Sequence, residues 1–220
     1  MRRVWITRTQ PQADATATRL RAMGLEPVVA PVLASRTVAG VDIDLSGIDA
    51  LAFTSAASVR AFADLSPARD LPVFAVGTAT AEAARGAGFG TIRMGGGDVH
   101  LLAATIAEAG LGPVLNPTAR EPAADLAVLL AARGVSARSV IVYETIPTDL
   151  AAPTDIDAVL IHSPRAARIA ADLISPARAQ ALSAFAISEA AAAPLRALAF
   201  ANLATAPFPD EASLLSLLQG

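Results

Sequence analysis

Short apolar runs alternate with alanine-rich stretches of helical spacing along the whole chain. The chain opens with a β-branched and aromatic run at residues 3–7, helical spacing from Pro11 to Gly24, and a second apolar run at 28–32. An early proline and a late glycine are typical helix boundaries. The order strand, helix, strand favours a parallel α/β sheet.

The same alternation continues to the last residues, and apolar runs between helical stretches predict a series of strands and helices. The further expected strands are 50–54, 73–76, 114–115, 140–145, 158–161 and 185–187. The further expected helices are 56–65, 78–86, 100–109, 123–133, 190–200 and 211–218. Ser55, Asp98 and Ser163 stand where N-caps are expected.

The composition excludes several kinds of catalytic and metal-binding chemistry. The chain has 220 residues, no Cys and no Lys, and 53 alanines, and its 17 basic residues are all Arg. This length suits one large domain or two of about 100 residues. The missing Cys excludes disulfides, thiolate catalysis and Cys-based zinc sites, and the missing Lys excludes Schiff bases and the P-loop.

The charge and the hydropathy pattern exclude several kinds of partner. The net charge is −3 with acidic and basic residues interspersed, so no nucleic acid partner is expected. Two separate histidines, His100 and His162, do not build a metal site, and no apolar run reaches the roughly 18 residues of a membrane span. The apolar stretch at the start is too short for a signal peptide. We expect a cytoplasmic monomer.

The second half of the chain resembles part of the first half. At a shift of 108 residues, Asp49-Ala50 falls on Asp157-Ala158, Ser55 on Ser163, Arg60 on Arg168 and 63–65 on 171–173, which makes 7 identities in 17 positions. At a shift of 111, Phe74-Ala75 falls on Phe185-Ala186. These matches predict two copies of one α/β unit.

The repeat leaves the spatial division open. The copies could form consecutive domains, or the first strand, helix and strand could complete the C-terminal half. In the second case residues 33–38 and 143–148 would cross between domains. A ligand would then lie in a cleft between domains, where pockets are common.

The two repeated strand ends are the natural candidate site. Ligands bind beyond the carboxyl ends of parallel strands, where Thr54-Ser55 and the segment 162–165 lie. A following helix start favours an anion, although ordinary capping explains these serines equally. Gly77-Thr78-Ala79-Thr80 is a third junction, and its repeat partner, residues 188–191, lacks both Gly and Thr.

Other candidates are weaker. Residues 95–98 are interpreted as a plain loop with a cap rather than as an anion cradle. His162 is interpreted as a packed histidine and His100 as a solvated one, with no partner of catalytic type apparent for either. Tyr143, the only Tyr, ends a strong strand, and its hydroxyl is suited to protonating a leaving oxygen. A structural aromatic remains an equal alternative there.

An ordered set of motifs resembles the uroporphyrinogen-III synthase family over nearly the whole chain. The motifs are 4–8 (Val-Trp-Ile-Thr-Arg), Gly24, 29–32 (Val-Ala-Pro-Val), 52–55 with Val59, 75–81, 140–145 and 161–164. The resemblance implies two flavodoxin-like domains of parallel α/β type joined by a two-stranded linker. It places residues 1–33 plus 152–220 in one domain and 40–142 in the other, with linkers at 34–39 and 143–151.

The resemblance also implies an activity. The family takes hydroxymethylbilane, a linear tetrapyrrole with eight carboxylates, removes water, and closes the ring through a spiro intermediate with inversion of ring D. No metal or cofactor is expected. By position, Tyr143 would donate the proton to the departing hydroxyl, and Ser55, Thr80 and Ser163 would contact substrate carboxylates. Thr54, Thr78 and Arg165 are added as neighbours, since Arg binds carboxylates in bidentate fashion.

One departure keeps alternatives open. The family's second Gly-x-x-Thr reads Ser188-Glu189-Ala190-Ala191 here, and Glu189 brings negative charge towards an anionic substrate. A non-catalytic module that binds a polycarboxylate or tetrapyrrole is therefore the second hypothesis. A flavodoxin-like or sugar-binding sensor is a weaker third, because no phosphoacceptor Asp clearly follows a strand.

Overall fold

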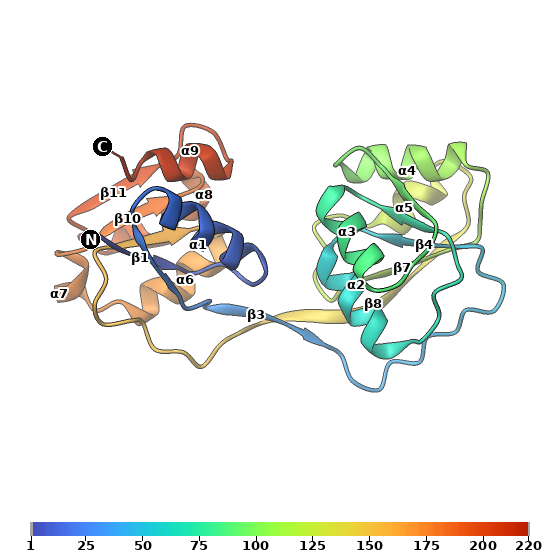
Figure 1. The fold of residues 1–220 in the computed structure, drawn as a ribbon, viewed down its shortest axis with the longest axis horizontal. Helices are drawn as coiled ribbons and strands as arrows, with labels where there is room; N and C mark the ends of the chain where they lie inside the picture. The colour runs from blue at the N-terminus through green and yellow to red at the C-terminus, as the bar shows by residue number, and fades with distance from the viewer. Residues whose placement is uncertain (1, 220) are drawn as a thin grey trace. The chain divides into compact units, whose positions relative to one another are not determined.

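The computed structural model describes residues 2–219, which divide into two compact units. Unit 1 holds the residues up to Ala34 and those from Ile146 onward, and unit 2 holds Ser35–Thr145. Each unit contains a sheet with helices on both faces (Figure 1). Two connecting segments therefore join the units, one at 34/35 and one at 145/146.

The sheet of unit 1 has five parallel strands. In spatial order they are β11 (Asn202–Thr205), β10 (Ser183–Ala186), β9 (Ala158–Ile161), β1 (Arg3–Ile6) and β2 (Glu26–Val29). The helices α1 (Gln12–Ala22) and α9 (Glu211–Ser216) pack on one face. The other face is covered by α6 (Pro164–Leu173), α7 (Pro176–Ala179), α8 (Glu189–Ala192) and the 3₁₀ helix η1 (Ala193–Ala197).

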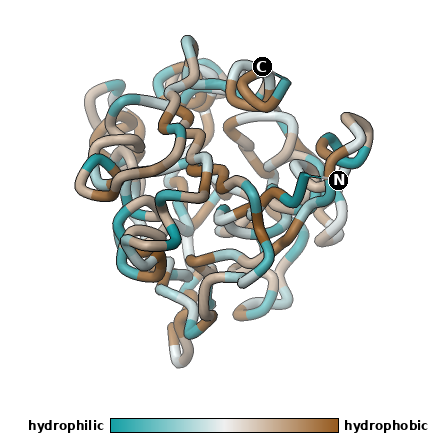
Figure 2. The backbone as a smooth tube through the Cα atoms, turned by 90° about the vertical axis from the view of Figure 1, so that its left-hand side faces the viewer, coloured by the Kyte–Doolittle hydropathy of each residue, from teal (hydrophilic) through white to brown (hydrophobic). Residues whose placement is uncertain are grey.

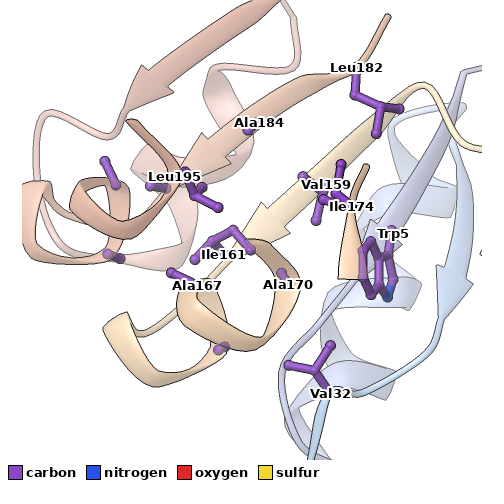
Figure 3. Close-up of a cluster of buried hydrophobic side chains, with 14 of the residues drawn as sticks. Trp5, Val32, Val159, Ile161, Ala167, Ala170, Ile174, Leu182, Ala184 and Leu195 are labelled. Atoms are coloured by element: carbon purple, nitrogen blue, oxygen red, sulfur yellow. The ribbon is translucent and has the colours of Figure 1, made fainter. Parts of the chain in front are cut away.

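Small side chains let the helices lie close to this sheet. Figure 3 shows Val159 and Ile161 of β9 and Trp5 of β1 in one buried cluster with Ala167 and Ala170 of α6. Trp5 is 1% exposed, and its indole Nε1 donates a hydrogen bond to the Ala30 carbonyl at 2.7 Å. The alanines that dominate the composition thus form the contact surface of α6, where larger residues would hold the helix away from the strands.

The sheet of unit 2 has six strands. Their order is β3 (Leu33–Thr37), β8 (Ala137–Pro147), β7 (Val114–Ala119), β4 (Ala50–Phe53), β5 (Val73–Ala75) and β6 (Ile92–Met94). The strands from β8 to β6 are parallel. The edge strand β3 runs antiparallel to β8, because hydrogen bonds join Thr148 to Val32 and Val38 to Val142.

The helices of unit 2 also cover both faces. On one face α2 (Ala56–Leu65) and α3 (Thr78–Gly86) enclose Phe53, Phe62 and Phe89, whose ring centroids lie 5.7 to 6.1 Å apart. The other face carries α4 (Val99–Glu108) and α5 (Leu126–Ala131). Aromatic pairs at these separations stabilise a core beyond the area that they bury.

The two sheets have the same order of equivalent strands. If β4, β5 and β6 are matched with β9, β10 and β11, and β7 and β8 with β1 and β2, both sheets follow one sequence of neighbours. The helices match as well, since α2 and α6 follow β4 and β9, and α5 and α1 follow β7 and β1. The difference lies in which strands come first along the chain.

Several expected elements need correction. The second strand is β2 at Glu26–Val29 rather than 28–32, and β7 extends well beyond the expected 114–115. The helix expected at 123–133 begins only after Asp125, which caps it through the backbone N–H groups of Ala127 and Val128. The helix expected at 190–200 is short, because Pro194 lacks a backbone N–H and the chain continues as 3₁₀ turns. The strands β6 and β11 were not expected, because both are edge strands in which polar residues, Arg93 and Asn202, break up the apolar run.

No helix among the described residues is long and apolar enough to cross a membrane. Figure 2 agrees, since hydrophobic stretches of the backbone are short and interrupted by hydrophilic ones.

The loop before α4 yields a stability prediction. A Cβ added at Gly95 would lie 2.5 Å from the Leu102 Cα, so Gly95→Ala requires the backbone to shift. We expect a loss of about 1–3 kcal/mol in the free energy of unfolding, measured by urea titration. The matched control is Gly90→Ala, since a Cβ at Gly90 meets no atom within 4 Å and should change stability by less than about 0.5 kcal/mol. Equal stability of the two variants would contradict the packing seen at Gly95.

Candidate functional site

A pocket of about 340 Å³ opens in unit 2, where several parallel strands end. Such a volume lies at the low end of small-molecule sites, which span about 300–1,000 Å³. Polar groups and small apolar groups share its wall. The lining residues are Thr54, Ser55, Val76, Val99, Thr118, Ala119, Glu121, Pro122, Ala123, Ala124 and Tyr143.

Strand geometry positions the polar wall. Thr54 and Ser55 directly follow β4, and Thr118 and Ala119 end β7. The pairing of β7 with β8 shifts register between Thr118 and Ala119, so that Ala119 lies opposite Tyr143. A bulge of this kind redirects side chains near it. The register shift therefore helps to bring the tyrosine to the end of β7, where the pocket begins.

The Ser55 and Tyr143 hydroxyls lie within hydrogen-bonding distance. The Ser55 Oγ and Tyr143 OH atoms are 3.1 Å apart, and either can donate. The Ser55 Oγ also accepts from the Ser58 backbone N–H at 3.0 Å, which makes Ser55 the N-cap of α2. The Ser58 hydroxyl donates to the Ser55 carbonyl at 2.8 Å and lies 3.2 Å from the Ser55 Oγ. These bonds fix the position of the Ser55 oxygen beside the phenol.

The structure thus brings together three of the residues predicted from sequence: Thr54, Ser55 and Tyr143. Thr78 and Thr80 do not line this pocket. Thr78 is exposed at the first turn of α3, whereas Thr80 is only 4% exposed and lies in the buried side of that helix. A buried hydroxyl contacts a ligand only if α3 moves, so a role for Thr80 stays a prediction.

Ser163 and Arg165 belong to unit 1. Ser163 is the N-cap of α6, and its Oγ accepts from the Ala166 N–H at 3.1 Å. Arg165 follows in the first turn of the same helix. Both lie beyond the carboxyl end of β9, which is the position in unit 1 equivalent to Ser55 in unit 2.

The glycine loop at 95–98 is a capped turn, as expected. Asp98 accepts hydrogen bonds from the backbone N–H groups of His100 and Leu101. The N–H groups of Gly95 and Gly97 donate to the carbonyls of Ala75 and Val76. Because these two amides are already used within the protein, they are not free to cradle an anion.

Two arginines hold the residue after the tyrosine. Glu144 accepts from Arg36 of β3 at 2.6 Å and from Arg120 at 2.9 Å. These hydrogen bonds from Arg36 and Arg120 hold the pKa of Glu144 below its usual range. The Arg120 backbone N–H also donates to the Tyr143 carbonyl. Tyr143 therefore sits in a strand fixed on both sides by main-chain and ionic contacts.

His162 is a packed histidine, as expected, but it has a partner that the sequence interpretation did not find. Its Nε2 lies 3.1 Å from the Glu211 Oε2, and its side chain is 6% exposed. Its Nδ1 is buried and lacks a hydrogen-bond partner among the described residues. Burial lowers the pKa of His162, and the hydrogen bond to Glu211 only partly opposes this, so the ring is neutral at pH 7.

Glu211 gathers three other polar side chains around it. Its Oε2 accepts from Arg8 at 2.6 Å, its Oε1 accepts from the Thr16 hydroxyl, and Arg19 lies 3.7 Å from Oε1. Burial raises the pKa of Glu211, but hydrogen bonds from His162 and Thr16 and the charge of Arg8 outweigh it and hold the pKa at about 2. We call these residues, Arg8, Thr16, Arg19, His162 and Glu211, the Glu211 cluster.

The sequence did not predict this cluster, nor Thr118 and Glu121 in the pocket. Arg8 and Glu211 are 203 residues apart, so no local pattern connects them. Their positions along the chain are the one local signal for the cluster. Each of Arg8, His162 and Glu211 comes shortly after a strand or an N-cap, at the carboxyl side of the sheet.

The suspected conflict at Glu189 is reduced by its neighbours. Glu189 forms an ion pair with Arg196, and hydrogen bonds from Thr205 and Arg196 lower its pKa. Its charge is therefore partly balanced within unit 1. Ser188 still caps α8 through the Ala191 N–H.

No group of three or more His, Cys, Asp or Glu residues suited to a metal ion occurs among residues 2–219.

A family model shows which family the chain belongs to, and a solved structure shows its fold. A family model described as uroporphyrinogen-III synthase HemD matches residues 14–216. Among solved structures, the uroporphyrinogen-III synthetase of Helicobacter pylori is 17% identical, with a TM-score of 0.68 over 100% of this chain and 99% of that one. A mutant uroporphyrinogen III synthase of Thermus thermophilus is 18% identical over 100% and 97%, with a TM-score of 0.49. No curated protein matches the chain.

The Glu211 cluster makes stability depend on pH. Folding lowers the pKa of both His162 and Glu211, so the unfolded chain binds more protons and stability falls as pH falls. The contribution of His162 is lost below about pH 6.5, and that of Glu211 from about pH 4.5 towards about pH 2. Arg8 acts on both groups, and Arg19 lies 3.7 Å from the Glu211 Oε1.

Urea unfolding of Glu211→Gln from pH 7 to pH 3 tests this. The variant should lose stability at pH 7 and show a flatter acid decline than the wild type, which should lose about 2 kcal/mol from Glu211 by pH 3. Glu108→Gln is the control, because Glu108 is exposed and makes no ion pair with a described residue. Parallel pH curves for wild type and Glu211→Gln would refute the coupling.

Proposed function

The chain belongs to the uroporphyrinogen-III synthase family, and on that premise we propose that the pocket beside Tyr143 is where hydroxymethylbilane loses water. The observation that carries this proposal is the contact of 3.1 Å between the Ser55 and Tyr143 hydroxyls at the pocket wall. Enzymes of this family are cyclising lyases of haem biosynthesis. The non-catalytic alternative has no support from the comparisons.

The hydroxyl pair can exist in two proton arrangements. In one, Tyr143 donates to the Ser55 Oγ, and Ser55 donates to the Ser58 Oγ at 3.2 Å. In the other, rotation of the Ser55 hydroxyl lets Ser55 donate to the phenol oxygen, and the Tyr143 proton turns towards the pocket. The Ser55 oxygen need not move, because the Ser58 N–H holds it in both cases.

The second arrangement supports general acid catalysis. As the substrate's C–O bond breaks, the phenol proton goes to the departing hydroxyl and water leaves. The hydrogen bond from Ser55 then stabilises the phenolate, as donors aimed at a developing negative charge do. The carbon that lost the hydroxyl then bonds to the substituted α carbon of ring D, which gives the spiro intermediate. The original bond between that α carbon and the bridge from ring C breaks, and the bridge carbon bonds to the other α carbon of ring D. This second α carbon releases its hydrogen as a proton, which the phenolate takes back. The net change is loss of one water, with Tyr143 restored.

The pocket is too small for the whole tetrapyrrole. We propose that it takes the reacting end, and that the remaining carboxylates bind polar groups at helix starts. Thr54, Ser55 and the exposed Thr78 would serve in unit 2, and Ser163 and Arg165 in unit 1. Helices α2 and α6 each have ten residues, and their N-terminal dipoles favour anions.

We further propose that the two units arose by duplication of one flavodoxin-like domain. If the five strands of unit 1 are numbered by their order along the chain, they lie side by side in the order 2-1-3-4-5. This is the order of flavodoxin-like sheets. In unit 2 the equivalent strands have the same neighbours, but the chain enters the sheet at a different strand. The seven identities between 49–65 and 157–173 support a common origin.

Product analysis tests the activity directly. Hydroxymethylbilane cyclises without help to isomer I, so the enzyme must yield uroporphyrinogen III, separated from isomer I by chromatography. A purified chain that yields only isomer I at the rate of the buffer blank would overturn the proposal and favour a binding module.

Tyr143→Phe tests the role of the phenol. The ring is kept and only the hydroxyl is lost, so kcat should fall by about 10²–10⁴-fold while the thermal midpoint stays close to wild type. The control is Thr105→Ala, which removes a hydroxyl that bonds only to its own helix, at the Leu101 carbonyl. A Tyr143→Phe enzyme with turnover near that of the control would remove Tyr143 from the mechanism.

A further inference from the structure

The Glu211 cluster carries more positive than negative charge. Arg8 and Arg19 supply two cations, Glu211 supplies one ionised carboxylate, and His162 is neutral. The neighbouring Asp210 caps α9 through the backbone N–H and hydroxyl of Ser213 and forms no ion pair with Arg8 or Arg19, so it is not counted in the cluster. One positive charge is therefore left over at a partly buried place.

The excess charge lies at the carboxyl edge of the sheet in unit 1. Arg8 is two residues beyond the end of β1, His162 directly follows β9, and Glu211 begins the helix after β11. These strands belong to one parallel sheet, so their carboxyl ends share an edge. Ser163, the N-cap of α6, follows His162 at the same edge.

Arg8 retains unused donors. Within the described residues it donates hydrogen bonds only from Nη1, to Glu211 at 2.6 Å and to Thr16 at 3.5 Å. The Nε and Nη2 groups of the guanidinium are left for another acceptor. The Arg8 side chain is 27% exposed, so solvent and solutes reach it although most of it is buried.

We propose that Arg8 binds a carboxylate of the substrate, and that Glu211 is the positioning residue that holds the guanidinium for it. The inference rests on the proposed function, because it takes the ligand to be a polycarboxylate. A guanidinium fork binds a carboxylate through two parallel N–H donors. Because its orientation is already set by Glu211, little side-chain freedom is lost when the ligand binds.

His162 accounts for the rigidity of this arrangement. Its Nε2–H donates to the Glu211 oxygen that Arg8 also uses, and its buried Nδ1 has no partner among the described residues. The buried, unpaired Nδ1 destabilises the folded state. The same placement of the ring keeps its neutral Nε2–H as a donor to Glu211. Glu211 thus receives donors from α1, β9 and the segment after β1, and it cannot turn away from Arg8 without leaving several of them unpaired.

The test compares Arg8→Gln with Arg21→Gln in the full chain. Arg21 is exposed on α1 and forms no ion pair with a described residue, so it controls for loss of one charge. For Arg8→Gln, the KM for hydroxymethylbilane should rise about tenfold or more with kcat within about threefold of wild type, as expected for a lost charged hydrogen bond. Arg21→Gln should leave both constants unchanged.

Two further variants separate binding from folding. Arg8→Lys keeps the charge but not the fork, so its KM should lie between those of wild type and Arg8→Gln. Arg8→Gln combined with Glu211→Gln leaves no unpaired carboxylate, and its KM should stay raised even where thermal unfolding shows a restored midpoint.

Two failures are distinguishable. A wild-type chain that makes no isomer III overturns the proposed function, and this inference falls with it. A wild type that makes isomer III, with an unchanged KM in Arg8→Gln and in the double variant, overturns the role of Arg8 alone. A raised KM that returns to wild type in the double variant would also overturn it, because the defect would then lie in folding.

Discussion

Backbone N–H groups at the start of each helix need acceptors, and this need shapes the functional edges of the protein. After β4, β9 and β10 the chain turns straight from a parallel strand into a helix. The first N–H groups of these helices have no partner within the helix. Ser55, Ser163 and Ser188 supply the missing oxygen after β4, β9 and β10. The residues that make the fold possible therefore place hydroxyls and positive helix ends where ligands bind.

The two units use that common edge differently. In unit 2 the cap at Ser55 contacts the hydroxyl of Tyr143, and small apolar residues complete a pocket around the pair. In unit 1 the equivalent edge carries a charged cluster centred on Glu211. The proposed loss of water from a polyanionic substrate requires both a site with a neutral acid and a site with cations. A neutral acid belongs at the reacting carbon, and fixed cations belong at the carboxylates.

Precise positions depend on contacts between distant segments. Tyr143 owes its place to the register shift between β7 and β8 and to the pairing of Arg36 and Arg120 with Glu144. Arg8 owes its orientation to a residue 203 positions away. The divergence at 188–191 is also understood only in three dimensions, since Arg196 and Thr205 partly balance the charge of Glu189.

The sequence by itself determined the alternation of strands and helices, because hydrophobic periodicity and capping residues are local signals. The helices at 56–65 and 78–86 and the cap at Ser55 were predicted at their observed positions. The edge strands β6 and β11 contain polar residues, so no apolar run marks them, and Pro194 shortens the helix that the alanine-rich pattern predicts. Of the candidate site, Thr54, Ser55 and Tyr143 were found from sequence as separate residues. Only the tertiary structure decided that the two hydroxyls touch, that Thr80 is buried, and that His162 pairs with Glu211, because long-range packing sets which side chains meet and leaves no mark on local spacing.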